Sequence, residues 1–298
     1  MSVRMHGGVL TAAVAISAGV LCGAAPAQAD PAWCPDLYVV AAPGTWETSL
    51  DDPRQGMLSM VTDGLPSNVR SDYVNYPATA LPWEGEVYGR SKMEAFTRAR
   101  GLVSSMAQQC GTTRFALLGY SQGADAVGDL AAEIGTGLGV VPADRVAAVG
   151  LIADPRRSPL DPLVGPPVPG AGAGGPRPTG FGWLSPRVRT FCAVGDLYCS
   201  TTTTDFATRI AGFFAQISAP DPAHMGRYQS EFQSILDDLM ISGGWPTLQL
   251  HLSDPNNEAR FREFFESAVH QSYPHYVVDD AGVTTMDWLR RWLTEAAR

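Results

Sequence analysis

The strongest restriction on the fold is an alternation of short apolar runs with helix-like stretches. The apolar runs are Leu37–Ala42, 114–121, 145–154 and 187–195, and apolar residues recur at helical spacing in 90–109 and 122–134. A further strand is expected at Tyr73–Tyr76, where Pro77 ends it. Apolar strands that alternate with helices favour a mainly parallel sheet covered by helices on both faces. We therefore expect an α/β fold whose site lies at the carboxyl ends of the strands.

Two segments interrupt this alternation. Residues 155–187 are rich in proline and glycine and predict a long loop, of the kind that is either functional or mobile. Residues 203–269 predict a helical insertion, in which one apolar stripe consists of Phe232, Ile235, Leu236 and Leu239. Such a stripe is typical of a packed core, and a cap over an active site would carry the same stripe. Both interpretations remain open.

The first residues have the pattern of an export signal. Arg4 precedes the uncharged stretch Val9–Leu21, and Ala27, Gln28 and Ala29 form a small-x-small cleavage site. The alternative is a membrane anchor, but the apolar stretch is short for a span and ends at a cleavage site. We expect residues 1–29 to be a signal peptide, cut near Ala29–Asp30, and residues 30–298 to form the exported domain.

Four cysteines remain after this cleavage, because Cys22 leaves with the signal. They are Cys34, Cys110, Cys192 and Cys199. An even number in an exported chain indicates two disulfides, for which the sequence allows three pairings. We favour Cys34–Cys110 and Cys192–Cys199, the second of which closes a short loop. A metal site is disfavoured, since no CxxC pair or histidine cluster accompanies these cysteines.

The charge of the chain restricts its partners. The formal net charge is −9, and there is no run rich in lysine or arginine. Nucleic acid is therefore excluded as an expected partner, and charge alone would not hold the protein on anionic lipid.

The stretch "LLGYSQGADAVG" (118–129) places Ser121 between two glycines, at the change from an apolar run to a helix. Glycines two residues before and after a serine allow a sharp strand–turn–helix bend that exposes the hydroxyl. The dipole of the following helix favours negative charge there. Ser121 is therefore a candidate nucleophile, and the alternative is a tight turn that happens to contain serine.

A serine nucleophile needs an imidazole base and a carboxylate that orients the base. Asp196 follows the strand 187–195, and Asp154, followed by Pro155 and two arginines, is a competitor that a structural ion pair would also explain. The histidines beyond the signal are His224, His251, His270 and His275, and a nucleophile elbow expects the histidine last. Chain order slightly favours the last two.

The chain resembles the cutinase-like serine esterases, in which five of its motifs recur in the same order along the sequence. They are "GTWE" (44–47), "NYPA" (75–78), "GYSQGA" (119–124), "FCAVGDLYC" (191–199) and "HQSY" (270–273). The resemblance implies a single α/β-hydrolase domain, a three-layer sandwich with two disulfides and a Ser–Asp–His triad that acts on carboxylic esters. Ser121 would be the nucleophile, Asp196 the acid and His270 the base, with His275 as the alternative base. Thr45 and the N–H of Gln122 would form the oxyanion hole. No metal or organic cofactor is implied.

Two departures from this family matter. Pro43 stands where cutinases usually have an arginine, and a long helical segment separates Asp196 from His270. Such a segment is similar to that of the phage lysin B esterases, which cleave mycolic acid from arabinogalactan, although those normally lack an export signal and paired cysteines.

The sequence therefore predicts a secreted, monomeric serine esterase that acts on lipid or cell-envelope esters. One alternative is an acyltransferase, similar to mycolyltransferases, that passes the acyl group to a sugar or glycerol hydroxyl. The other is a non-catalytic protein that binds envelope lipid or glycan on the same fold.

Overall fold

The fold is seen in a computed structural model of the chain, which describes residues 2, 30–222 and 225–298. Residue 2 apart, the predicted signal peptide 1–29 lies outside the described residues, and so does His224. Among the helices of the described part, none is both long and apolar enough to cross a membrane.

The centre of the molecule is a parallel sheet with the strand order β2-β1-β3-β4-β5. Its strands are β1 (Leu37–Ala42), β2 (Val69–Tyr73), β3 (Arg114–Tyr120), β4 (Val146–Ile152) and β5 (Val188–Phe191). Because all the pairs are parallel, the carboxyl ends of the strands share one edge of the sheet.

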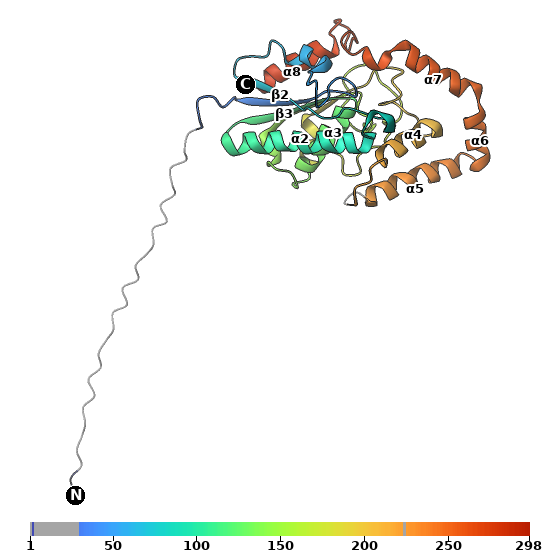
Figure 1. Cartoon of the computed structure of the whole chain (residues 1–298), viewed down its shortest axis with the longest axis horizontal. Helices are drawn as coiled ribbons and strands as arrows, with labels where there is room; N and C mark the ends of the chain where they lie inside the picture. The colour runs from blue at the N-terminus through green and yellow to red at the C-terminus, as the bar shows by residue number, and fades with distance from the viewer. Residues whose placement is uncertain (1, 3–29, 223–224) are drawn as a thin grey trace.

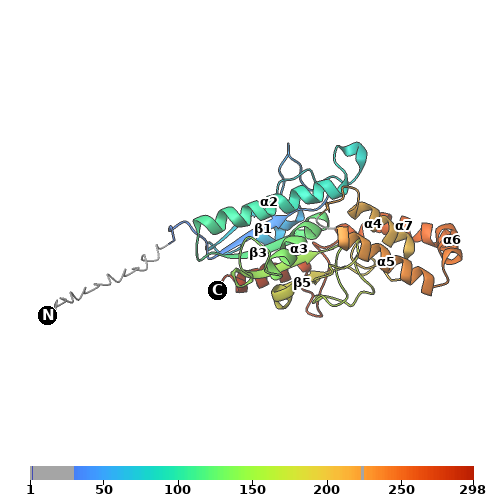
Figure 2. The same ribbon diagram turned by 90° about the horizontal axis from the view of Figure 1, so that it is seen from below.

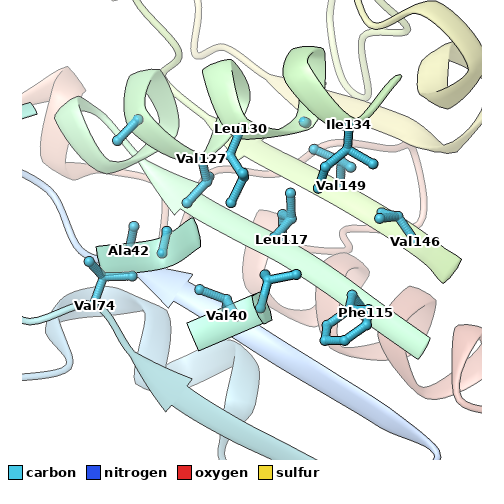
Figure 3. Close-up of a cluster of buried hydrophobic side chains, with 14 of the residues drawn as sticks. Val40, Ala42, Val74, Phe115, Leu117, Val127, Leu130, Ile134, Val146 and Val149 are labelled. Atoms are coloured by element: carbon cyan, nitrogen blue, oxygen red, sulfur yellow. The ribbon is translucent and has the colours of Figure 1, made fainter. Parts of the chain in front are cut away.

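Strand β1 shows why the sheet is covered on both faces. Its six residues are all buried, and alternate side chains enter two different apolar clusters. Tyr38, Val40 and Ala42 join one cluster and Leu37, Val39 and Ala41 the other, since successive side chains of a strand point to opposite faces. Figure 3 shows the first cluster, in which Val40 and Leu117 of the sheet lie beneath Val127 and Leu130.

Helices cover the two faces of the sheet. Helices α2 (Tyr88–Gln109) and α3 (Gln122–Gly135) pack on the first cluster, and α1 (Ser59–Thr62) and α8 (Thr285–Ala296) on the second. In Figure 1, α8 lies on the opposite side of the sheet from α2 and α3. The predicted three-layer α/β architecture is confirmed.

The other helices gather at one end of the molecule, as Figure 2 shows. They are α4 (Phe206–Gln216), α5 (Met225–Ile241), α6 (Trp245–Ser253) and α7 (Pro255–Ser267), and they occupy the predicted helical insertion. A single turn, η6 (Val269–Gln271), follows α7 and leads back to the carboxyl edge of the sheet.

The proline- and glycine-rich segment between β4 and β5 packs on buried arginines. Arg157 is 2% exposed, and its guanidinium donates to the carbonyls of Gly170 (2.6 Å) and Cys199 (2.7 Å). The backbone carbonyls of a loop without regular hydrogen bonding are satisfied in this way.

Several short turns lie in the connections. The turns η3 (Ala143–Arg145) and η4 (Gly182–Arg187) directly precede β4 and β5, while η1 (Gly56–Leu58) and η2 (Pro82–Glu84) belong to the loops that precede α1 and α2.

The predicted strand at Tyr73–Tyr76 is wrong. The strand there is β2, which ends at Tyr73, and Tyr76 instead buries its ring and donates its hydroxyl to the carbonyl of Pro43 (2.7 Å). Because β2 is an edge strand whose residues are only partly buried, its sequence "VRSDY" lacks the apolar run by which the other strands are recognised.

Candidate active site

Ser121 lies at the turn between β3 and α3, on the carboxyl edge of the sheet. Its backbone has φ 54° and ψ −121°, a conformation that is uncommon for a residue other than glycine. Its N–H donates to the carbonyl of Ile152 on the neighbouring strand (2.9 Å), and the residue is 6% exposed. The strained turn directs the hydroxyl away from the sheet and towards the histidine described below.

Close packing explains the two glycines that flank this turn. A Cβ at Gly123 would lie 2.1 Å from the carbonyl oxygen of Ala42, and one at Gly119 would lie 2.6 Å from the Cα of Ala124. Both distances are well below the van der Waals contact distance, so neither position accepts a side chain without a shift of the backbone. The motif is therefore required by the close approach of α3 to β1 and β3.

His270 reaches Ser121 from the turn η6 at the far end of the helical insertion. The distance from its Nε2 to the Oγ of Ser121 is 2.8 Å. Two tyrosines fix the position of His270. The hydroxyl of Tyr120 donates to the backbone carbonyl of His270 (2.6 Å), and the ring of Tyr198 stacks on the imidazole with centroids 4.3 Å apart.

Asp196 lies behind the histidine, in the loop after β5. It is fully buried, and its Oδ2 lies 2.9 Å from the Nδ1 of His270. The Cys192–Cys199 disulfide closes this loop on either side of Asp196. The structure thus brings Ser121, His270 and Asp196 together, in the order that a base between a nucleophile and an orienting carboxylate requires. That these residues are catalytic stays a prediction.

Two further donors hold the Asp196 carboxylate. The hydroxyl of Tyr273 donates to Oδ2 (2.7 Å), and the backbone N–H of Tyr198 donates to Oδ1 (3.0 Å). Tyr273 is itself fully buried and accepts the N–H of Ala193 (3.0 Å). Burial and the charge of Asp196 hold the pKa of the Tyr273 hydroxyl well above its usual range, so it keeps the proton that it donates.

The role of Tyr273 was not recognised in the sequence, although the "HQSY" motif contains it. Its position three residues after His270 gives a signal, because a turn of that length returns the chain to the same site. A lone tyrosine carries no indication of its hydrogen-bond partner, so the contact with Asp196 could not be derived from the pattern.

Gln122 and Thr45 lie next to the nucleophile. Gln122 is the first residue of α3, where a backbone N–H has no acceptor within its own helix. Its side chain is fixed from behind, since Nε2 donates to the carbonyl of Thr79 (3.0 Å) and Oε1 accepts from Ser91 (3.2 Å). Thr45 follows Gly44, at which a Cβ would fall 3.3 Å from the Cβ of Ser121.

A partly buried glutamate, Glu47, holds the turn that carries Thr45. The carboxylate of Glu47 accepts the N–H of Gly44 (2.8 Å) and the N–H of Met57 (2.9 Å). Burial raises the pKa of Glu47, an effect that these two hydrogen bonds oppose. Glu47 therefore ties the loop after β1 to the segment that precedes α1.

The structure separates the competing residues from this site. Asp154 forms a buried ion pair with Arg177 (2.6 Å), as a structural role predicts, but with a partner other than the two arginines that follow it in the chain. His275 is exposed, and His251 lies in α6, where its ring is 5.6 Å from that of Phe206.

Both favoured disulfides, Cys34–Cys110 and Cys192–Cys199, are present. Within the described ranges, 2, 30–222 and 225–298, no group of three or more histidine, cysteine or acidic residues could hold a metal ion.

Comparison with known proteins gives one family and several relatives. The model of the family described as Cutinase matches residues 33–219. A carboxylesterase Culp6 homolog from Corynebacterium glutamicum is 37% identical over 211 residues, which are 58% of this chain and 67% of that protein. Carboxylesterase Culp1 from Mycobacterium tuberculosis is 31% identical over 200 residues, which are 66% of this chain and 82% of that protein.

Solved structures with some likeness include the catalytic core domain of acetyl xylan esterase from Trichoderma reesei. It has a TM-score of 0.46 and 21% identity and covers 68% of this chain and 100% of its own. Lysin B from a mycobacteriophage has a TM-score of 0.48 and 17% identity, and the match covers 88% of this chain and 98% of that chain.

Proposed function

Because the chain belongs to the cutinase family and is a carboxylic ester hydrolase, we propose that it cleaves esters through a covalent acyl-enzyme on Ser121. The observation that supports this mechanism is the position of His270, whose ring nitrogens lie 2.8 Å from the hydroxyl of Ser121 and 2.9 Å from the carboxylate of Asp196.

The first half of the reaction acylates Ser121. The Oγ attacks the ester carbonyl while its proton passes to Nε2 of His270, and Asp196 holds the imidazole by Nδ1–H and stabilises the imidazolium. The imidazolium then gives the proton to the departing alcohol oxygen. Water repeats these steps on the acyl-enzyme, which releases the carboxylic acid and restores Ser121.

The negative charge that develops on the carbonyl oxygen needs donors aimed at it. We assign this role to the backbone N–H of Gln122 and to Thr45, through its backbone and side chain. Each such donor typically lowers the barrier by about 3 kcal/mol. The N-terminus of α3 adds its positive partial charge at the same point.

We further propose that the protein is exported and that its substrates are lipid or cell-envelope esters. Two disulfides fit an oxidising compartment. The export signal and the natural substrate are proposals that the activity tests below do not depend on.

The proposal is tested by hydrolysis of nitrophenyl esters with acyl chains of two to sixteen carbons. The wild type is compared with Ser121→Ala, His270→Ala and His275→Ala. We expect the first two variants to lose kcat/KM by about 10⁴-fold or more, and His275→Ala to stay within about twofold of the wild type.

Thermal melting of each variant provides the control, since Ser121→Ala removes one hydroxyl of little structural weight. Hydrolysis that persists in a folded Ser121→Ala protein contradicts the mechanism. Product analysis with added glycerol or sugar separates hydrolysis from acyl transfer, because only transfer yields a new ester.

A further inference from the structure

Trp46, the residue after Thr45, is held in a strained conformation beside the proposed reacting centre. Its φ is 65°, in the left-handed region that bulky residues rarely adopt. Its side chain is nevertheless 61% exposed. Strain of this kind persists only where the surroundings enforce it, and it concentrates at functional sites.

Hydrogen bonds hold every polar group of Trp46. Its N–H donates to the carbonyl of Ala78 (2.8 Å), and its own carbonyl accepts from the guanidinium of Arg54 (3.4 Å). The indole Nε1–H donates to Oε1 of Glu84 (2.8 Å). The part of Trp46 that is exposed to solvent is therefore the apolar surface of its ring.

Glu84 is itself fixed as an acceptor. Its Oε2 accepts the backbone N–H groups of Ala80 (3.0 Å) and Leu81 (2.9 Å). These two bonds lower the pKa of Glu84, so the carboxylate stays charged at neutral pH. We refer to the contact between Trp46 and Glu84 as the indole bracket.

The indole bracket is joined to the reacting centre on two sides. The carbonyl of Thr79, in the segment that carries the bracket, accepts from the side chain of Gln122 (3.0 Å), which follows the nucleophile. On the other side, Gly44 lies two residues before Trp46 and against Ser121. The ring is thus tied to the two segments that hold the proposed oxyanion donors.

A rigid, exposed aromatic surface binds an apolar group at little cost in conformational entropy, because the ring is already ordered. We propose that Trp46, held by Glu84, forms one wall of an apolar subsite for the hydrocarbon part of the ester that Ser121 attacks. This inference rests on the proposed function, and it deepens it by naming the surface that selects the substrate.

The test compares Trp46→Ala with Trp183→Ala in the full-length protein. Trp183 is a matched control, because it is 81% exposed and lies in η4. This turn packs on Gly135 at the far end of α3, about 20 Å from Ser121 by the rise of the helix. Two substrate series are used: nitrophenyl esters of increasing acyl length, and alkyl acetates of increasing alcohol length.

We expect Trp46→Ala to raise KM about tenfold for the long members of one series and to leave kcat and the shortest ester within about twofold. The series that responds identifies the bound chain as acyl or alcohol. Trp183→Ala should change neither series. Glu84→Gln keeps the Trp46 side chain but replaces its charged hydrogen-bond acceptor with a neutral amide, so the ring is held less firmly. This variant should raise KM with the same dependence on chain length.

The outcomes separate the inference from the proposed function. Losses of equal size for short and long esters, together with a lower melting temperature, would mean that Trp46 only stabilises its turn, and they would overturn the subsite. Unchanged kinetics would overturn it as well. If Trp46→Ala does not fold, Glu84→Gln decides the matter by the same criterion. A wild type that hydrolyses no ester would refute the proposed function itself.

Discussion

At the scale of single residues, the Asp196 carboxylate is notable for the donors around it. It is fully buried, and it contacts His270 Nδ1, the Tyr273 hydroxyl and the Tyr198 N–H. A buried carboxylate needs such partners, because an uncompensated charge in the interior is costly. Tyr273 and His270 share the same oxygen, so the tyrosine affects how strongly Asp196 supports an imidazolium.

Replacing Tyr273 with Phe removes this donor without changing the shape of the ring. The remaining carboxylate becomes a stronger base and stabilises the His270 imidazolium more, so the acidic limb of the kcat/KM profile should move to higher pH. We also expect kcat/KM at its optimum to fall about tenfold, because the carboxylate that orients the imidazole loses one of the hydrogen bonds that fix its position. Measurement of hydrolysis across pH 4 to about 9 tests both effects.

Tyr276→Phe is the control for this change. Its hydroxyl accepts the N–H of Val194 (3.2 Å) in the same loop region, and within the described part of the chain it forms no hydrogen bond with Asp196. Its pH profile should match the wild type. A Tyr273→Phe enzyme that is slower but has an unshifted profile would mean that the hydroxyl only positions Asp196 and does not affect how strongly the carboxylate supports the imidazolium.

The sequence predicted the positions of residues better than their contacts. Ser121 could be found because the chemistry of its turn is local, within "GYSQG". The contacts of Asp196 with Tyr273 and of Trp46 with Glu84 join residues far apart in the chain, and only the fold brings them together.

At the scale of elements, a buried cluster of charges joins the helical insertion to the helices that cover the sheet. Asp125 and Asp129 on α3 receive groups from four other segments: Tyr88 and Lys92 of α2, Arg177 of the long loop, Gln216 of α4 and Arg227 of α5. Asp125 lies one helical turn after Ser121, and its N–H donates to the carbonyl of Ser121 (3.0 Å). The insertion is thus anchored directly behind the nucleophile.

Arg177→Ala should destabilise the protein by about 3–5 kcal/mol, because it leaves the fully buried Asp154 without its cation and removes one of the cations that neutralise Asp129. Denaturant unfolding measures this loss. Arg98→Ala, which breaks an exposed pair with Glu94 (2.6 Å), is the control and should cost less than about 1 kcal/mol. Equal losses in the free energy of unfolding for the two variants would show that the buried ion pairs of Arg177 stabilise the protein no more than an exposed pair does.

Most elements could be predicted from periodicity, and the exception is instructive. Strands β1, β3 and β4 are buried on both faces and read as continuous apolar runs. The edge strand β2 carries Arg70 and Asp72 towards solvent, so its pattern was not recognised and the strand was placed too late in the chain.

At the scale of the whole molecule, two disulfides act on different properties. Cys34–Cys110 joins residues 76 apart and ties the start of the described domain to the end of α2. Cys192–Cys199 joins residues only 7 apart and encloses Asp196. Loop-closure entropy assigns the larger stabilisation to the first, about 4 kcal/mol against about 2 kcal/mol for the second.

We therefore expect the double variant Cys34→Ala with Cys110→Ala to lower the free energy of unfolding by about 4 kcal/mol and to keep its esterase activity. The double variant Cys192→Ala with Cys199→Ala should lose less stability and more activity, since the loop that positions Asp196 is released. Unfolding curves and kcat/KM on one soluble ester distinguish them. The reverse order of activities would contradict this assignment.

The match to the family model covers only part of the chain. It ends at residue 219, so α5–α8 and His270 lie beyond the matched segment. The alternation of strands and helices predicted the sheet and its layers, but the return of α7 to the carboxyl edge depends on packing between helices that no local pattern encodes.

The most direct test of the central claim, that Ser121 forms a covalent intermediate, is the intact mass of the full-length protein after treatment with a nitrophenyl phosphonate ester. We predict the addition of one phosphonyl group per chain, located on the peptide that contains Ser121, with parallel loss of ester hydrolysis and no addition to Ser121→Ala. Addition to another residue, or equal addition to the Ser121→Ala variant, would contradict the claim.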